Sequence, residues 1–131
     1  RVPFMGTGEY VNMEGQQVFR VAVRKMVDML ERACEAENVT LEDLDMIVPH
    51  QANQRIIEAA RKMIKFPKER VFNQMWEYGN TSSNTIPLAL HTVIPNQQPG
   101  DKVGLSAFGG GYTFGAAIME VLPTSDGDPP V

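Results

Sequence analysis

The chain has 131 residues, of which 43% are hydrophobic and 21% charged, a composition typical of one folded domain that excludes disorder and collagen-like structure. Twelve Lys and Arg against sixteen Asp and Glu give a net charge of −4, which argues against a general nucleic-acid-binding role. No apolar run approaches the length of a membrane span and no basic-then-apolar leader is visible, so we expect neither a membrane segment nor a secretion signal.

The first half of the chain predicts a helix, a strand and a second helix. Apolar residues at three- and four-residue spacing predict an amphipathic helix over residues 14–37. The short apolar run at 44–48 predicts a buried strand that Pro49 closes. A second helix is predicted over 52–65, with apolar residues on one side and basic residues on the other, and Pro67 stops it.

The second half predicts three further strands and one helix. Residues 71–74 read as a short strand, and the polar turn 79–83 leads into a helix that runs to about Val93. Strands are also expected at 103–107 and 112–122, with a loop of three glycines between them.

Alternating strands and helices predict an α/β layered domain, with a mixed sheet and flanking helices, over residues 13–122. We expect residues 1–12 to form a leading loop. Residues 123–131, rich in proline and aspartate, are expected to form a mobile tail.

Positive charge is concentrated in one segment. Residues 52–70 hold six basic and two acidic residues, a net charge of +4, which leaves −8 on the rest of the chain. A solvated helix face and a docking surface for an acidic partner both fit this count.

Three polar or glycine positions follow predicted strands, where ligands collect in α/β layers. His50 directly follows the strand at 44–48 and could donate a hydrogen bond, although a lone histidine is more often structural. Asn80 either donates to a ligand oxygen or only bonds to the backbone of its turn. The glycines 109–111 either let backbone N–H groups approach a ligand or form a tight turn.

Cys34 is the single cysteine and lies near the end of the first predicted helix, among glutamates. A nucleophilic thiolate needs a cation or a helix amino terminus nearby, so we expect a packing residue. One cysteine and two histidines provide neither an internal disulfide nor a zinc site, so a reducing cytoplasm is the expected setting and no metal is expected.

Three motifs occur together and in order: VPHQANQRI at 48–56, YGNTS at 78–82 and AFGGGYTFG at 107–115. With them the chain resembles the carboxyl-terminal half of the β-ketoacyl-acyl-carrier-protein synthase III family, which has the thiolase fold. The resemblance runs from about Met13 to Leu122. Plant chalcone synthases share the fold and the His/Asn pair, but the HQAN and FGGG motifs favour the bacterial type III enzymes.

The resemblance implies a condensing acyltransferase of fatty acid biosynthesis. In that family a cysteine takes an acyl group from acyl-CoA, and malonyl-acyl carrier protein is decarboxylated and condensed onto it. No cofactor is implied beyond the coenzyme A and carrier-protein thioesters that serve as substrates. By resemblance, His50 and Asn80 donate hydrogen bonds to the malonyl thioester oxygen, and the Gly110 N–H contributes to a second oxyanion hole.

The resemblance also implies binding residues. Asn53 and Arg55 match positions near the pantetheine arm, and Phe108 would pack beside the His/Asn pair. Because acyl carrier proteins are strongly acidic, the basic segment becomes a candidate docking surface, made of Arg55, Arg61, Lys62 and Lys65.

Two departures from the family predict an incomplete enzyme. The family's cysteine lies in an amino-terminal half that this sequence lacks, and Cys34 does not match it. The thiolase half-fold is expected to have five strands with the first in the middle; only four are predicted here, and the missing one is the first. We therefore expect a fragment or one subunit of a split enzyme, inactive alone and dimeric when complete. The alternative is a non-catalytic ketosynthase-like subunit that binds acyl carrier protein or a partner subunit.

Overall fold

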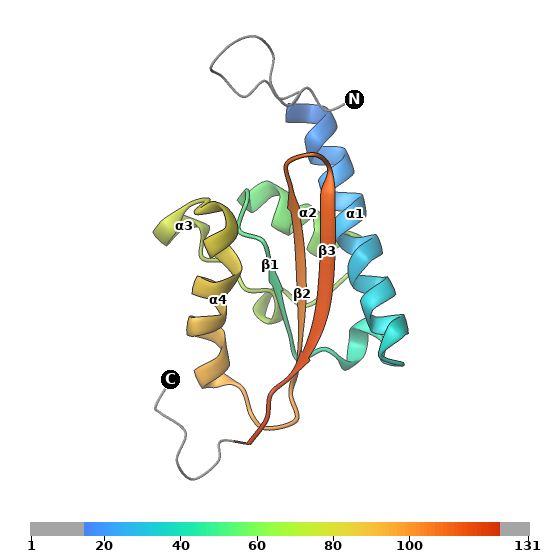
Figure 1. Cartoon of the computed structure of the whole chain (residues 1–131), viewed down its shortest axis with the longest axis vertical. Helices are drawn as coiled ribbons and strands as arrows, with labels where there is room; N and C mark the ends of the chain where they lie inside the picture. Colours follow the sequence, from blue (N-terminus) through green and yellow to red (C-terminus); the bar gives the residue numbers. More distant parts are fainter. Residues whose placement is uncertain (1–14, 124–131) are drawn as a thin grey trace.

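Three strands form one mixed sheet in the computed structural model, which describes residues 15–123 (Figure 1). The order is β1-β2-β3, with β1 parallel to β2 and β2 antiparallel to β3. The predicted α/β class with a mixed sheet is confirmed. The predicted loop 1–12 lies outside the described residues, as does the predicted tail apart from Pro123. The helices and strands are α1 (Gly15–Ala36), β1 (Met46–Pro49), α2 (Gln54–Met63), α3 (Met75–Tyr78), α4 (Thr85–Val93), β2 (Lys102–Gly109) and β3 (Thr113–Glu120).

Helices cover both faces of the sheet, with α1 and α2 on one side and α4 on the other (Figure 1). Successive strand residues point to opposite faces, so neighbouring residues of β1 enter different clusters. Ile47 packs with Leu30 of α1, whereas Val48 packs with Ala89 of α4. β1 is therefore buried on both faces, which explains why the run 44–48 shows little alternation.

Close approach of α1 to the sheet depends on a glycine in β2. A Cβ at Gly104 would lie 2.8 Å from Leu44 Cδ1 and 3.0 Å from Leu30 Cδ1, closer than unstrained packing allows. Two residues further along the strand, the buried Ser106 hydroxyl donates a 2.9 Å hydrogen bond to the Met26 carbonyl of α1. These contacts fix the helix against the strand that leads to the candidate site.

The strand predicted at 71–74 is wrong. Val71 makes only an isolated parallel bridge with Ile47, and residues 72–74 lead irregularly into α3. The reason is that a side chain replaces the strand ladder. Gln51 donates to the Phe72 carbonyl and accepts from the Gln74 N–H, so these backbone groups are satisfied without a neighbouring strand.

The first of the five expected strands, the middle one, is predicted to be absent from this chain and to leave unpaired backbone groups. In residues 15–123, β1 pairs directly with β2 from Met46↔Val103 to Pro49↔Ser106, so the sheet has no open gap between them. Within residues 15–123, β3 pairs only with β2 and leaves its other edge without a strand.

The helix predicted after the turn at 79–83 is present as α4 (Thr85–Val93). A 3₁₀ turn over Ser82–Asn84 precedes α4, and Ser82 has a φ of +58° that an α-helix cannot include. The other predicted helices and strands have bounds within a few residues of those observed. None of the helices among residues 15–123 is long and apolar enough to cross a membrane.

Candidate active site

His50 is the first residue after β1, at the carboxyl end of the strand, and its side chain is half-buried. Its backbone N–H donates a 2.7 Å hydrogen bond to the Ser106 carbonyl of β2. Its ring atom Nδ1 lies 2.5 Å from Oγ1 of Thr85, at the start of α4. Burial lowers the pKa of His50 below its ordinary value of 6.5, because the charged imidazolium loses water there. The imidazole is therefore neutral at pH 7.

Phe108, near the end of β2, lies beside His50. The two ring centroids are 5.6 Å apart and the rings meet edge to face at 74°. Phe108 also packs against the cluster formed by α1 and α2, so its ring is held by the core. It supplies an apolar wall to one side of the imidazole.

Gly110 lies in the turn between β2 and β3, two residues beyond Phe108. Gly111 and Tyr112 have φ values of +77° and +54°, and the Thr113 hydroxyl donates to the Gly110 carbonyl at 2.8 Å. Gly109 ends β2, and residues 110–112 form the hairpin turn. The exposed Gly110 stands at the tip of this turn, on the same end of the sheet as His50.

Asn80 lies in a strained loop between α3 and α4. Gly79 has φ +64° and ψ −155°, a region that essentially only glycine adopts, and Ser82 is left-handed. Asn80 Oδ1 accepts a 2.9 Å hydrogen bond from the Ser82 N–H. This bond fixes the carbonyl side of the amide and leaves its NH₂ group as the donor side. Asn80 is exposed, and Thr85 at the end of the same loop contacts His50.

Asn53 and Arg55 lie at the start of α2, shortly after His50. Asn53 caps the helix, with Oδ1 accepting a 2.8 Å hydrogen bond from the Arg55 N–H. Both residues are exposed. Arg55 is a cation in the first turn, where the helix dipole disfavours positive charge, so helix stability does not account for it.

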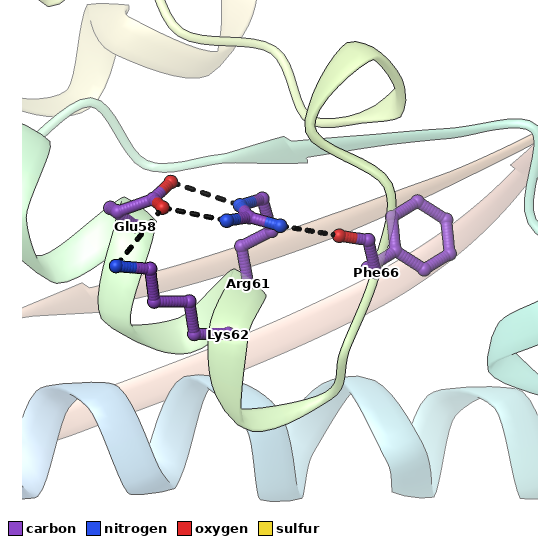
Figure 2. A network of polar contacts seen from close by, with 4 residues as sticks. All are labelled: Glu58, Arg61, Lys62 and Phe66. Atoms are coloured by element: carbon purple, nitrogen blue, oxygen red, sulfur yellow. Dashed lines mark hydrogen bonds and ion pairs between the residues drawn. The ribbon is translucent and has the colours of Figure 1, made fainter.

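The candidate docking residues differ in how strongly their charged groups pair with other residues of the chain (Figure 2). Arg61 makes a two-pronged pair with Glu58, at 2.9 and 2.6 Å, and donates to the Phe66 carbonyl at 2.9 Å. This pairing lowers the pKa of Glu58 to about 2. The Lys62 ammonium lies 3.6 Å from Glu58, and its side chain is 69% exposed, against 18% for Arg61. Lys65 is exposed as well.

Cys34 lies in the last turn of α1. It is 2% exposed and belongs to the cluster with Leu30, Leu44 and Phe66. Burial raises the pKa of its thiol, and the nearby carboxylates of Asp43 and Glu31 raise it further. The expectation of a packing cysteine matches this placement.

Two residues near the site were missed by the sequence reasoning. Thr85 bonds to His50, and the buried Gln51 joins the end of β1 to the segment before α3. Gln51 is adjacent to His50 and could have been singled out as a polar residue beside a buried strand. Thr85 is 35 positions from His50, and nothing in the local pattern links the two.

Comparisons with known proteins show which protein family this chain is similar to. The model of the family described as "3-Oxoacyl-[acyl-carrier-protein (ACP)] synthase III C terminal" matches residues 34–121. A beta-ketoacyl-[acyl-carrier-protein] synthase III of Oleidesulfovibrio alaskensis is 43% identical over 120 residues, which cover 88% of this chain and 36% of that protein. The Aquifex aeolicus protein of the same name is 41% identical over 112 residues, covering 84% of this chain and 36% of the relative.

Solved structures agree with this likeness. The 3-oxoacyl-[acyl-carrier-protein] synthase III of Aquifex aeolicus has a TM-score of 0.81 at 41% identity, over 85% of this chain and 37% of that one. The synthase III of Thermus thermophilus has the same TM-score and identity, over 90% of this chain and 39% of that one. The chain thus spans a little over a third of the length of these relatives. Because the family model matches more than half of its residues, the chain belongs to the 3-oxoacyl-[acyl-carrier-protein] synthase III C-terminal family.

Proposed function

We propose that the chain supplies the hydrogen-bond donors of a β-ketoacyl-acyl-carrier-protein synthase III-like condensing enzyme of fatty acid biosynthesis. The reaction is a decarboxylative Claisen condensation of malonyl-acyl carrier protein with an acyl thioester. The observation that carries the proposal is His50: a neutral, half-buried imidazole at the carboxyl end of β1, with Nδ1 bonded to Thr85. This leaves Nε2 as the ring atom available to a substrate.

Decarboxylation needs donors at one oxygen. When the malonyl group loses carbon dioxide, the electrons of the broken C–C bond pass to the thioester oxygen and form an enolate. His50 Nε2–H and the Asn80 NH₂ group donate to that oxygen and stabilise its developing negative charge. Asn80 is suited to this because the Ser82 N–H already occupies its carbonyl side. A neutral imidazole has one N–H, and it donates this bond when that proton is on Nε2.

Carbon–carbon bond formation follows at the acyl thioester. The enolate carbon attacks the acyl carbonyl carbon, whose electrons move to oxygen, and collapse of this tetrahedral intermediate expels a thiolate. The Gly110 N–H, at the tip of the hairpin, donates to the intermediate's oxygen. Phe108 excludes water beside His50, which protects the enolate from protonation before it reacts.

The nucleophilic cysteine comes from outside this chain. Cys34 is buried in the α1 core with a raised pKa, and it is the chain's single cysteine. A second half or partner subunit therefore brings the thiol that holds the acyl group. The β3 edge, which carries no further strand among residues 15–123, offers one place for such a partner to join the sheet. We expect the complete enzyme to be dimeric.

The exposed residues of the basic segment form the docking surface for the carrier protein. Arg55, Lys62 and Lys65 are exposed near the amino and carboxyl ends of α2, while the Arg61 guanidinium is engaged by Glu58. Arg55 begins the same helix that follows His50 by a short loop. A carrier protein bound there would present its thioester arm from the side of the candidate site.

The test uses the chain assembled with its cysteine-bearing half. His50→Ala and Asn80→Ala should each lower malonyl decarboxylation and condensation by about 10²–10³, because each removes a donor from the enolate oxygen. Labelling of the cysteine by radioactive acyl-CoA should persist in both variants. The exposed His91 of α4 provides a matched His91→Ala control that should change neither step.

Two outcomes contradict the proposal. Loss of acyl labelling in His50→Ala, with labelling retained in Asn80→Ala, would make His50 a general base for the cysteine. An assembled enzyme that binds acyl carrier protein but condenses nothing would instead support the non-catalytic, ketosynthase-like subunit.

A further inference from the structure

Thr85 is the partner of His50, and almost all of its surface is removed from solvent. It is 3% exposed at the first position of α4, and its Oγ1 lies 2.5 Å from His50 Nδ1. Among residues 15–123 this is the one hydrogen bond that the Thr85 hydroxyl makes. Water has little room to take its place at Nδ1.

The direction of this bond decides what the rest of the imidazole can do. A neutral imidazole carries its proton on one ring nitrogen and accepts at the other. If Thr85 accepts, the proton sits on Nδ1, and Nε2 is an acceptor that cannot bond to a thioester oxygen. If Thr85 donates, Nδ1 is the acceptor and Nε2 carries the N–H.

We propose that Thr85 is a positioning residue that donates its hydroxyl proton to His50 Nδ1 and thereby keeps the N–H on Nε2. Nδ1 is the one partner of the buried Thr85 hydroxyl among residues 15–123, so the hydroxyl proton has an acceptor there only if Thr85 donates. The consequence for catalysis rests on the proposed function. Thr85 acts through His50 and touches no substrate.

The two other contacts of His50 do not affect which ring nitrogen carries the proton. The His50 backbone is held by the Ser106 carbonyl, and Phe108 meets the ring edge to face. Neither contact is a hydrogen bond to a ring nitrogen, so neither distinguishes Nδ1–H from Nε2–H. The β-branched Thr85 has few side-chain rotamers in a helix, which keeps its hydroxyl near the ring.

The first test measures the tautomer in the full 131-residue chain. Nitrogen-15 NMR of histidine-labelled protein at about pH 8, where the imidazole is neutral, separates protonated from unprotonated ring nitrogens. A His91→Gln background removes the other histidine. We expect an unprotonated Nδ1 and a protonated Nε2 for His50. A protonated Nδ1 would overturn the proposal without any further variant.

Variants then separate the effect of the Thr85 hydroxyl on the tautomer from the effect of the side-chain shape. Thr85→Val should give a mixture of tautomers, and Thr85→Ser should restore the single Nε2–H form. Thr92→Val, an exposed substitution of the same kind on α4, should leave the spectrum unchanged. An unchanged single tautomer in Thr85→Val would also contradict the proposal.

In the assembled enzyme, Thr85→Val should lower malonyl decarboxylation on the order of tenfold, less than the loss of the His50 donor itself. Thr85→Ser should recover most of that rate, and acyl labelling of the cysteine should not change. Failure of the proposed function would appear as no condensation by the unmodified chain, whatever the tautomer. A normal decarboxylation rate in Thr85→Val would instead count against the positioning role alone.

Discussion

The Gln51 side chain accepts a 2.8 Å hydrogen bond from the backbone N–H of Gln74 through its Oε1. Its Nε2 donates to the carbonyls of Pro49 and Phe72, at 2.8 and 3.3 Å. One buried amide therefore joins the end of β1, beside His50, to the segment that leads through α3 to the Asn80 loop. This side-chain amide, and not a second pair of strands, connects the His50 end of β1 with the segment that leads to the Asn80 loop.

Removing this amide should destabilise the chain. Gln51→Leu leaves the Gln74 N–H and two carbonyls without the partners they now have, and about 1–3 kcal/mol should be lost from the free energy of unfolding. Gln51→Glu should also destabilise, because a carboxylate would face the Pro49 and Phe72 carbonyls. Urea unfolding measures both. Gln54→Leu, at an exposed position in the same region, is the control, and an equal loss there would rule out a special role for Gln51.

The stability of the chain should fall on mild acidification because of His50. Its pKa in the folded chain is below the unfolded value near 6.5, so the unfolded state binds more protons as the pH falls. The free energy of unfolding should therefore decrease as the pH falls from about 6.5 to the folded pKa, and this contribution should be fully present above 6.5.

Thermal unfolding of His50→Gln and His91→Gln between about pH 7.5 and pH 5 isolates this contribution, since most carboxylates titrate lower. The decrease should be smaller in His50→Gln and unchanged in His91→Gln. The same pH dependence in both variants would mean that His50 is not the group responsible.

Arg61 and Lys62 should differ in their effect on stability, although both were predicted to face a carrier protein. Arg61→Ala removes both bonds to Glu58 and the bond to the Phe66 carbonyl, and it should lower the midpoint of urea unfolding clearly. Lys62→Ala should leave it almost unchanged, because its ammonium is exposed and only loosely paired. Equal midpoints for the two variants would contradict the structural role of Arg61.

Charge reversal at Arg55, Lys62 and Lys65 should slow the assembled enzyme with malonyl-acyl carrier protein and spare malonyl-CoA far more. Arg61 is left intact so that the fold is preserved. The effect should weaken as salt rises, because the screening length is about 8 Å at physiological ionic strength. Arg24→Glu, on the exposed face of α1, is the control. Equal losses with both malonyl donors would show a solvated face without a docking role.

Cys34 should react slowly with thiol reagents while the chain is folded. It is buried and its pKa is raised, so labelling should be on the order of 10² or more slower than in urea-unfolded protein. Absorbance of a released aromatic thiol follows the reaction, and Cys34→Ala gives the background. Rapid labelling of the folded chain would reopen Cys34 as a candidate nucleophile.

Sequence patterns located the parts of the chain that depend on local periodicity. The apolar spacing in α1, the buried run at β1 and the motifs around His50 and Phe108 predicted elements that the structure contains. Local patterns reach this far because each helix or strand must bury its own apolar face. The roles assigned to His50, Asn80 and Gly110 came from the family resemblance and stay predictions.

The remainder was decided by contacts between residues far apart in the chain. Residues 71–74 have the composition of a strand, yet beyond the bridge of Val71 to Ile47 the Gln51 amide takes up the Phe72 carbonyl and the Gln74 N–H, and no ladder forms. In the sequence Arg61 is one more basic residue of a charged segment, whereas in the structure it bonds to Glu58 and to the Phe66 carbonyl.

By itself, then, the sequence determined the three longer helices, which run is buried and where a polar residue follows the end of a strand, but it did not predict α3. Only the tertiary structure decided that β1 pairs directly with β2, that Gln51 stands in for a strand and that Thr85 contacts His50. The physical reason is that a hydrogen bond across 35 positions leaves no periodic trace in the sequence. His50 and Thr85 come within hydrogen-bonding distance only when α4 packs against the sheet.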